Sequence, residues 1–224
     1  MGPRSATARR YAGKSAEERD DERRARLLDA GLEVFGTVGY AASAIETICS
    51  TARVATREFY ALFGTKERLL LEVDARIVSE AAEGIAAALD ATPGGVAPRI
   101  RAGLRAYADV FADNPRRARV HFFEVLAVAA DAGGHRRVTG DQLMAIFLAE
   151  GQRLMGLGLI PQRDLSITSG ALLGATRYAM TEWATDPSRH SVDEVIDELV
   201  RLFVMGLSHD LPAGRAGDGL VAQR

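Results

Sequence analysis

Residues 39–73 read GYAASAIETICSTARVATREFYALFGTKERLLLEV, and this stretch decides the fold. It predicts two short helices joined by a tight turn. We expect the first to begin at Ser43, because the run from Ser43 to Glu46 has the form of a capping box, in which the serine oxygen accepts an amide and the glutamate reaches back. A turn at Arg53 leads into a helix of about two turns that ends before Phe63. With a covering helix before them, these elements have the layout of a helix-turn-helix unit.

Apolar residues recur at helical spacing along nearly the whole chain, for example at Val192, Ile196, Leu199 and Phe203. Alternating runs of Val, Ile and Tyr, which would predict strands, are missing from the sequence. We therefore expect an all-α chain, which Gly, Pro and capping residues divide into about nine helices. The first expected helix spans residues 20–36, the second runs from residue 43 to the turn at 53, and the third runs from that turn to residue 62. The remaining six span residues 65–90, 96–112, 115–130, 136–157, 165–185 and 191–208.

The helix-turn-helix unit needs an apolar interior. Cys49 falls where two short helices cross closely, a position that demands a small side chain. We interpret its thiol as a small buried apolar group rather than as a redox centre. The expected inward positions are Ile45, Ile48, Cys49, Val54, Phe59 and Phe63, packed on Leu28, Leu32 and Phe35.

Charge divides the chain unevenly. Up to Lys66 the sequence holds 11 basic and 9 acidic residues, a net charge of +2, whereas the remainder holds 17 and 21, a net charge of −4. This asymmetry is typical of a small N-terminal unit that faces an anionic partner. The predicted parts are a flexible arm over residues 1–19, a helix-turn-helix domain over 20–66, a larger helical domain over 67–210 and a frayed tail over 211–224.

The composition of the 224 residues excludes several classes of protein. A single cysteine rules out an intramolecular disulfide framework and argues against a Cys-based zinc site, so we expect no metal, no cofactor and a reducing, cytoplasmic setting. The longest apolar runs are well short of the roughly 18 residues that a membrane span needs. The N-terminal segment mixes both signs of charge and lacks the apolar region of a signal peptide. We therefore expect no membrane partner.

The motif of residues 39–73 resembles the DNA-binding domain of the TetR family of bacterial transcriptional regulators. The shared features are the Gly-Tyr turn, the Ser cap, the Ile-small pair, the Val turn and the ending Tyr-x-x-Phe-x-x-Lys-Glu-x-Leu-Leu. A weaker similarity to the family's closing segment begins at Trp183 and continues in the helix after Ser191. The resemblance implies a DNA-binding N-terminal domain and a helical C-terminal domain that binds a small ligand and dimerises.

Two positions depart from the family pattern. The family usually has Gly where Arg53 stands, in a turn that tends to need positive φ, so Arg53 is expected to cost about 1 kcal/mol. The usual Ser cap of the second short helix is replaced by Ala55, which loses roughly 1 kcal/mol of capping unless Thr56 takes over. Both changes lie on the recognition element, so they bear on docking and sequence preference and not on the fold.

By resemblance, the second short helix enters the major groove of DNA. Thr56 and Arg57 would then read bases, and Arg57 would ideally be bidentate to a guanine. The plainer alternative for each residue is a solvated surface side chain. Five further arginines could add minor-groove or backbone contacts, but a solvated face is the preferred interpretation for them: Arg9, Arg10, Arg23, Arg24 and Arg26. Phosphate contacts are implied for Ser43, Arg53, Tyr60 and Lys66.

Ligand candidates in the larger domain are aromatic or polar residues on otherwise apolar helices. Taken singly, each is better explained as part of the core than as a ligand contact. Arg177 is the sharpest case, since a guanidinium among apolar neighbours needs an anionic ligand or a partner such as Glu124 or Glu182. The candidates are Tyr107, Phe111, His121, Phe122, Phe147, Arg177, Tyr178 and Trp183.

The last two helices are the expected dimer surface. Gly170 and Gly174 are four residues apart and allow another helix to approach closely, although packing within the chain is the alternative. The helix from Val192 to Leu207 is apolar around more than one face, which a monomer would not leave in water. A two-fold dimer would match a palindromic operator with half-sites spaced by about 34 Å, one turn of DNA, or a multiple of it.

We expect no enzyme. A helical di-iron site needs Glu-x-x-His on two helices, and His121-x-x-Glu124 stands alone in the reverse order. The common nucleotide, hydrolase and zinc-protease motifs are also absent from the sequence. The sequence therefore predicts a homodimeric, ligand-responsive regulator, in the repressor role commonest in the family, that binds double-stranded operator DNA and is released by a small-molecule effector. The alternative is a helical small-molecule or protein-binding dimer that has lost operator affinity through Arg53 and Ala55.

Overall fold

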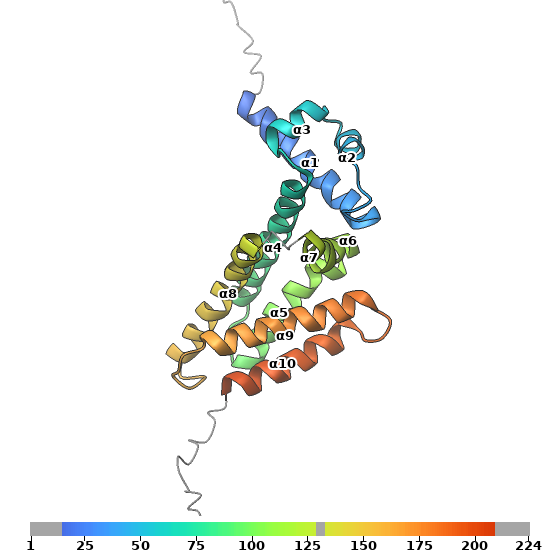
Figure 1. Ribbon diagram of the computed structural model, residues 1–224. Coiled ribbons are helices and arrows are strands. Elements are labelled where there is room, and N and C mark those ends of the chain that lie inside the picture. The colour runs from blue at the N-terminus through green and yellow to red at the C-terminus, as the bar shows by residue number, and fades with distance from the viewer. Residues whose placement is uncertain (1–14, 129–132, 209–224) are drawn as a thin grey trace, which may run out of the picture. The chain divides into compact units, whose positions relative to one another are not determined.

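The computed structural model describes residues 15–128 and 133–208, and these residues form helices without any strand. The all-α prediction is therefore confirmed. The chain divides into two compact units whose boundary falls between Val73 and Asp74, inside the long helix α4 (Lys66–Ala91) (Figure 1). The sequence pattern placed this boundary after Lys66. No described helix is long and apolar enough to cross a membrane. The predicted tail and most of the predicted arm lie outside the described residues.

The first helix of the N-terminal unit begins before the predicted Asp20. Ser15 and Glu18 form a capping box that was not predicted: the Ser15 Oγ accepts from the Glu18 amide at 3.0 Å, and the Glu18 carboxylate accepts from the Ser15 amide at 2.6 Å. At the other end, Gly39 has φ 87° and closes the helix, as glycine after a helix commonly does. The helices of this unit are α1 (Ala16–Val38), α2 (Ile45–Ala52), α3 (Thr56–Leu62) and the first turns of α4.

The interior of this unit follows the prediction in α2 and α3 but not in α1. The buried face of α1 includes Leu27, whereas the predicted Leu28 and Leu32 are half-buried. Gly31 gives the reason: a Cβ at this position would lie 3.1 Å from a methyl carbon of Val73 and only slightly farther from a neighbouring leucine, so α4 packs closely at the glycine. The predicted residues found buried are Phe35, Ile48, Cys49, Val54, Phe59 and Phe63, and Ile45 is half-buried.

Beyond Asp74 the helices follow the predicted punctuation closely. The Asn114 Oδ1 accepts from the Arg116 amide at 3.1 Å, with Pro115 at the first helical position. The Ser191 Oγ accepts from the Glu194 amide at 3.2 Å, as a capping box requires. The helix predicted from residue 115 contains a π-helical turn that was not predicted. The helices are α5 (Val96–Ala112), α6 (Pro115–Arg119), the π-helix η1 (Val120–Glu124), α7 (Val125–Val128), α8 (Gly133–Gly156), α9 (Ser166–Thr185) and α10 (Val192–Ser208).

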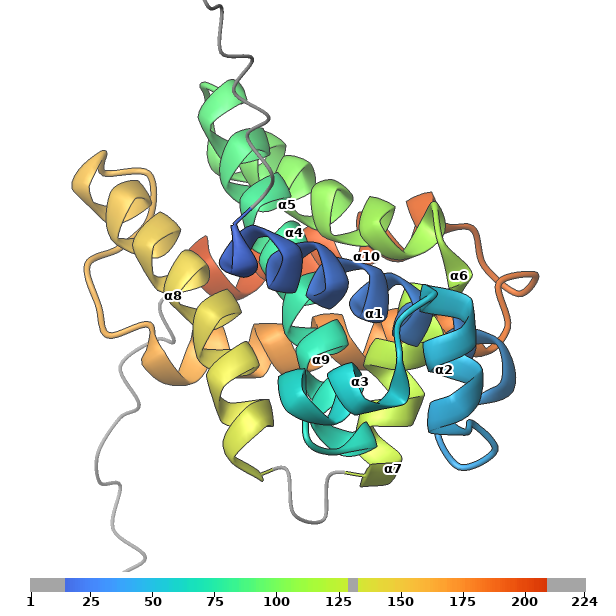
Figure 2. The ribbon, with the colours of Figure 1, turned by 90° about the horizontal axis from the view of Figure 1, so that it is seen from above.

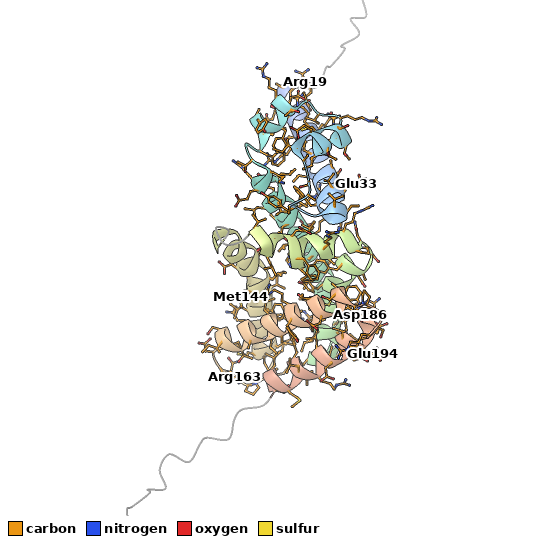
Figure 3. All side chains as sticks on the ribbon, turned by 45° about the vertical axis from the view of Figure 1, so that its right-hand side comes forward. Arg19, Glu33, Met144, Arg163, Asp186 and Glu194 are labelled. Carbon is orange, nitrogen blue, oxygen red and sulfur yellow. The ribbon has the colours of Figure 1, made fainter. Side chains whose placement is uncertain are left out.

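The C-terminal unit is a bundle in which α10 packs against both α5 and α9, and α9 also contacts α6 and α8 (Figures 1 and 2). Helices α9 and α10 run antiparallel. Arg163, just before α9, lies at the opposite end of the pair from Asp186 and Glu194 (Figure 3), and its guanidinium donates to the carbonyl of Gly206 near the end of α10. The two closing helices therefore form one layer of the bundle.

Candidate DNA-binding surface and ligand cavities

The turn between α2 and α3 has the backbone shape that the sequence predicted. Arg53 has φ 53° and ψ 48°, in the left-handed region, and no other non-glycine residue among those described has positive φ. A residue other than glycine pays about 1–2 kcal/mol for this conformation. The Arg26 guanidinium donates to the Arg53 carbonyl at 3.4 Å, while the side chain of Arg53 is exposed. The turn thus directs α3 away from α2 and leaves a cation on the surface.

The first turn of α3 has only one of the two hydrogen bonds of a capping box. Ala55 stands at the N-cap without a side-chain acceptor, and the Glu58 carboxylate accepts from the Ala55 amide at 3.3 Å. Thr56 does not replace the missing acceptor, because its hydroxyl hydrogen-bonds the thiol of Cys49. Burial raises the pKa of that thiol, and the hydrogen bond from Thr56 lowers it in part. The predicted loss of the cap at Ala55 is therefore confirmed.

Arg57 and Tyr60 lie three residues apart on α3 and so share one face of the helix. Both side chains are exposed, and the Tyr60 ring packs edge-on against Phe59 with ring centroids 5.4 Å apart. Arg57 forms no ion pair with any residue in the described ranges. This face presents a guanidinium group and a phenol, and Arg53 adds a second exposed guanidinium in the turn before α3. These donors suit base edges and phosphates.

Ser43 and Lys66 make contacts within the N-terminal unit that the motif did not predict. The predicted capping box at Ser43 is wrong: Ala44 is the N-cap of α2, and the buried Ser43 hydroxyl donates to the Tyr40 carbonyl at 2.7 Å. The Lys66 ammonium donates to the carbonyls of Tyr40 and Ser43, both at 2.8 Å, and lies 4.3 Å from the centroid of the Tyr40 ring. Tyr40, which sequence reasoning passed over, is therefore the centre of a network that joins the α1–α2 turn to the start of α4.

Two arginines of α1 are engaged inside the N-terminal unit. The Arg23 guanidinium lies 3.4 Å from a Glu58 carboxylate oxygen. Arg24 pairs with the Glu72 carboxylate and lies 4.8 Å from the centroid of the Phe63 ring. These contacts tie α1 to α3 and α4, so the two arginines support the position of α3 rather than standing free for DNA.

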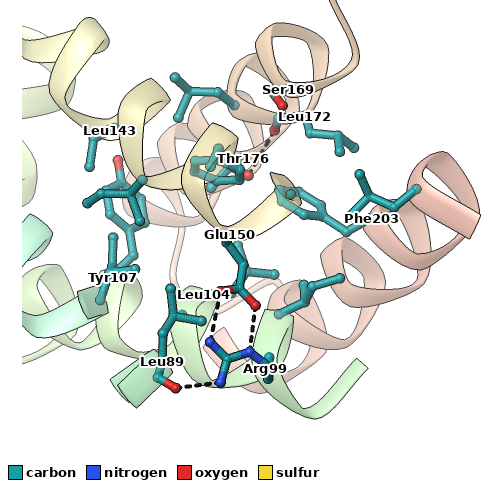
Figure 4. Close-up of a pocket in the computed structure, with 18 of the residues that line it drawn as sticks. Leu89, Arg99, Leu104, Tyr107, Leu143, Glu150, Ser169, Leu172, Thr176 and Phe203 are labelled. Carbon is teal, nitrogen blue, oxygen red and sulfur yellow. Dashed lines mark hydrogen bonds and ion pairs between the residues drawn. The ribbon is translucent and has the colours of Figure 1, made fainter. Parts of the chain in front are cut away.

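The C-terminal unit contains an apolar cavity of about 70 Å³ among α4, α5, α8, α9 and α10. One end holds a buried ion pair in which the Arg99 guanidinium donates to both oxygens of Glu150, at 2.5 and 2.8 Å (Figure 4). Arg99 also donates to the carbonyls of Leu89 and Thr92. Aliphatic side chains form most of the wall, and the predicted candidates among the lining residues are Tyr107 and Phe147.

A second cavity, of about 270 Å³, is more polar. Asp74 lies there with only 2% of its surface exposed, and its Oδ1 is 2.6 Å from the Nδ1 of His121. Arg177 lines the same cavity and has an exposed side chain. Burial raises the pKa of the Tyr107 hydroxyl, the Asp74 charge raises it further, and Arg177 lowers it. Tyr107, His121 and Arg177 are thus predicted candidates that the structure brings together.

The remaining ligand candidates do not line these two cavities. Phe111 and Phe122 are buried against each other with ring centroids 4.8 Å apart, and Phe111 also stacks on His121. Tyr178 and Trp183 line a separate groove on the outer side of α9 and α10. These side chains were predicted as ligand contacts from their residue type alone. Residue type does not tell whether a side chain lies in the core, in a cavity or on the surface.

One expectation about α9 needs correction, and a second concerns its glycine pair. Glu124 is not the partner of Arg177, because its carboxylate accepts from the Arg119 guanidinium at 3.0 Å. Gly170 and Gly174 line the second cavity, and a Cβ at Gly170 would contact Met144 of α8 at 3.6 Å. The glycine pair therefore borders cavity space within the chain, and its close approach to a helix of another subunit stays a prediction. The residues that sequence reasoning missed are Asp74, Arg99 and Glu150.

Comparison with known proteins agrees with this arrangement. Residues 27–73 match the family described as bacterial regulatory proteins, tetR family. The chain is 24% identical over 207 residues to the HTH-type transcriptional regulator EthR of Mycolicibacterium smegmatis, covering 91% of this chain and 94% of that protein.

Two solved structures are similar at the level of the fold. A transcriptional regulator FadR from Bacillus subtilis in complex with stearoyl-CoA has a TM-score of 0.73 at 17% identity, covering 82% of this chain and 98% of that chain. A TetR-family transcriptional regulator from Syntrophomonas wolfei has a TM-score of 0.71 at 19% identity, covering 84% and 96% of the two chains.

Proposed function

We propose that this chain, which carries the DNA-binding domain of the tetR family of bacterial regulatory proteins in its N-terminal unit, is a ligand-responsive repressor that binds a palindromic operator as a homodimer. The family expected from residues 39–73 is confirmed by the match over residues 27–73 and by the relative EthR, so the protein is a transcriptional regulator of the helix-turn-helix class. The repressor role, the operator and the effector are the proposal. The observation that carries it is the exposed face of α3 with Arg57 outside any described ion pair.

DNA contact is assigned to α3 and to the turn before it. Arg57 reads a base, Tyr60 and Arg53 hold phosphates, and Thr56 contacts the same groove from the half-buried first position of the helix. Ser43 and Lys66 support this surface through the Tyr40 network. Lys66 directs two of its three N–H donors to carbonyls and retains one for a phosphate.

The proposed dimer forms through the outer face of α9 and α10. Ile167 is 86% exposed, and Tyr178, about three turns later on α9, is 69% exposed. Leu202 and Met205 add exposed apolar surface on α10, and one groove is lined by both Tyr178 and Leu202. Large apolar side chains that gather on one surface favour a protein partner, and a two-fold copy of the chain satisfies the symmetry of a palindrome.

An effector in the C-terminal unit would control DNA binding through α4. This helix lines both cavities and continues into the N-terminal unit. The regulator FadR, similar in fold, was solved with stearoyl-CoA, which supports an effector site in this kind of fold. A ligand that fits only one position of α4 would shift the population toward dimers whose two α3 helices no longer match the half-sites.

Selection from a random pool of double-stranded DNA tests the proposal directly. Full-length protein should enrich an inverted repeat, and the Arg57→Ala variant should bind it more weakly with relaxed preference at one base pair. A pool without any enriched sequence would favour the alternative of a ligand-binding or protein-binding dimer without operator affinity.

The dimer surface can be tested by sedimentation. Ile167→Glu, on the proposed face, should shift the protein toward monomer. Leu157→Glu is the matched control, because Leu157 is 58% exposed at the end of α8 and outside that face. Equal behaviour of the two variants would contradict the proposed dimer.

A further inference from the structure

The two cavities of the C-terminal unit adjoin each other but differ in chemistry. Tyr107, Leu143 and Leu173 line both of them, so these side chains border the apolar space on one side and the polar one on the other. Figure 4 shows Tyr107 and Leu143 on one side of the apolar cavity, Phe203 on the opposite side and the Arg99–Glu150 pair below and between them. A ligand that spans both cavities must therefore carry two chemically different ends.

The apolar cavity has no charge to offer a ligand. Arg99 and Glu150 neutralise each other in a bidentate pair. The Nη1 group of Arg99 also donates to the carbonyls of Leu89 and Thr92. Two buried hydroxyl groups also border it, those of Ser169 and Thr176, and the Thr176 hydroxyl donates to the Leu172 carbonyl at 2.9 Å. Since the charged pair is already satisfied and most of the wall is aliphatic, the space suits an alkyl chain.

The polar cavity adds charged groups to a lining that is otherwise largely apolar. Arg177 forms no ion pair with any residue in the described ranges, although its charge lies close enough to Tyr107 to affect that hydroxyl. The one carboxylate in the lining, Asp74, is almost completely covered and is held by His121 at 2.6 Å. The guanidinium of Arg177 is therefore the group that is open to a ligand, and its planar donors match a carboxylate.

We propose that the effector is an amphiphile with one alkyl chain and a carboxylate head, bound with the head at Arg177 and the end of the chain in the apolar cavity beyond Tyr107. The inference rests on the proposed function, because it names the ligand class of the same effector site. The polar cavity of about 270 Å³ is the larger of the two and has room for the head and the first methylenes, whereas the apolar cavity of about 70 Å³ takes only the end of the chain. A cationic head is disfavoured because it would face Arg177 and would have to displace His121 from Asp74.

Calorimetry with the full-length protein and three ten-carbon probes tests the head. Decanoate should bind, 1-decanol should bind at least tenfold more weakly, and decyltrimethylammonium should bind most weakly. Arg177→Gln should lower decanoate affinity at least tenfold and leave 1-decanol unchanged. Arg116→Gln, an exposed arginine of α6 outside both cavities, is the matched control and should bind all three probes as the parent protein does.

Chain length tests the apolar cavity. Acetate should fail to bind, because it leaves that cavity empty, and affinity should rise through hexanoate to decanoate. Tighter binding of the ammonium probe, equal loss in the two arginine variants, or acetate binding as well as decanoate would each overturn the proposal.

The DNA assay separates this inference from the proposed function. Ligand binding is measured without DNA, so decanoate that binds through Arg177 in a protein that selects no operator would refute the regulator and leave the ligand class standing. An enriched palindrome together with absent decanoate binding would refute the ligand class and leave the regulator standing.

Discussion

Replacing Lys66 by methionine removes a charged group that holds the α1–α2 turn to α4. Two N–H bonds to the Tyr40 and Ser43 carbonyls are lost, and so is the contact of the ammonium with the Tyr40 ring. Hydrogen bonds to charged groups contribute about 1.5–3 kcal/mol each and a cation–π contact about 0.5–1 kcal/mol. Because Lys66 is only half-buried and water can replace part of this, we expect a loss of about 2–3 kcal/mol from the N-terminal unit.

Amide hydrogen exchange measured on peptides of α1 and α2 reports this loss. At a factor of ten for every 1.4 kcal/mol, amides protected by the folded unit should exchange about 30- to 150-fold faster. Arg68→Met is the matched control two residues farther along α4, where an exposed pair with Glu72 at 3.1 Å is worth about 0.3–0.5 kcal/mol. If Lys66→Met exchanges no faster than Arg68→Met but loses DNA affinity, Lys66 acts on phosphate alone and the reasoning is wrong.

Three further variants probe the site and the fold. Arg57→Ala should weaken operator binding by about 1–3 kcal/mol in a gel-shift titration and leave binding to random DNA nearly unchanged; equal losses on both would make Arg57 a phosphate contact. Arg53→Gly should raise the free energy of unfolding by up to about 1 kcal/mol in urea, because glycine adopts φ 53° without strain, and destabilisation would refute the assigned turn. Glu150→Gln leaves Arg99 buried without its counter-charge and should cost about 3–5 kcal/mol by thermal unfolding, whereas a change below about 1 kcal/mol would show that the pair is dispensable.

Local signals made most of the fold predictable. Asn114 before Pro115, and Ser191 before Glu194, mark helix starts through atoms within three residues of one another, and the structure has those bonds. Ser43 obeys the same pattern and fails, because the Tyr40 carbonyl three residues earlier is a competing acceptor. The Ser43 amide also donates to that carbonyl at 3.2 Å, so residues 40–43 form a turn that holds Ser43 before the helix.

The cavities were less predictable because their polar groups meet across long separations. Arg99 and Glu150 are 51 residues apart, and Asp74 and His121 are 47 apart, so no spacing rule on one helix connects them. Tyr107 and Arg177 were found by residue type, yet the same criterion selected Tyr178 on the outer surface. The face of α9 that lines the cavity is decided by its packing on α8, which the sequence of α9 alone does not contain.

The boundary between the two units falls inside α4, so one uninterrupted helix belongs to both. If this shared helix couples effector binding to operator binding, as proposed, the two events obey one thermodynamic cycle. An effector that lowers operator affinity a hundredfold must itself be bound a hundredfold more weakly by the DNA-bound protein than by the free protein. The regulator would therefore sense the ratio of effector to free operator sites, and additional operator copies in a cell would raise the effector concentration needed for release.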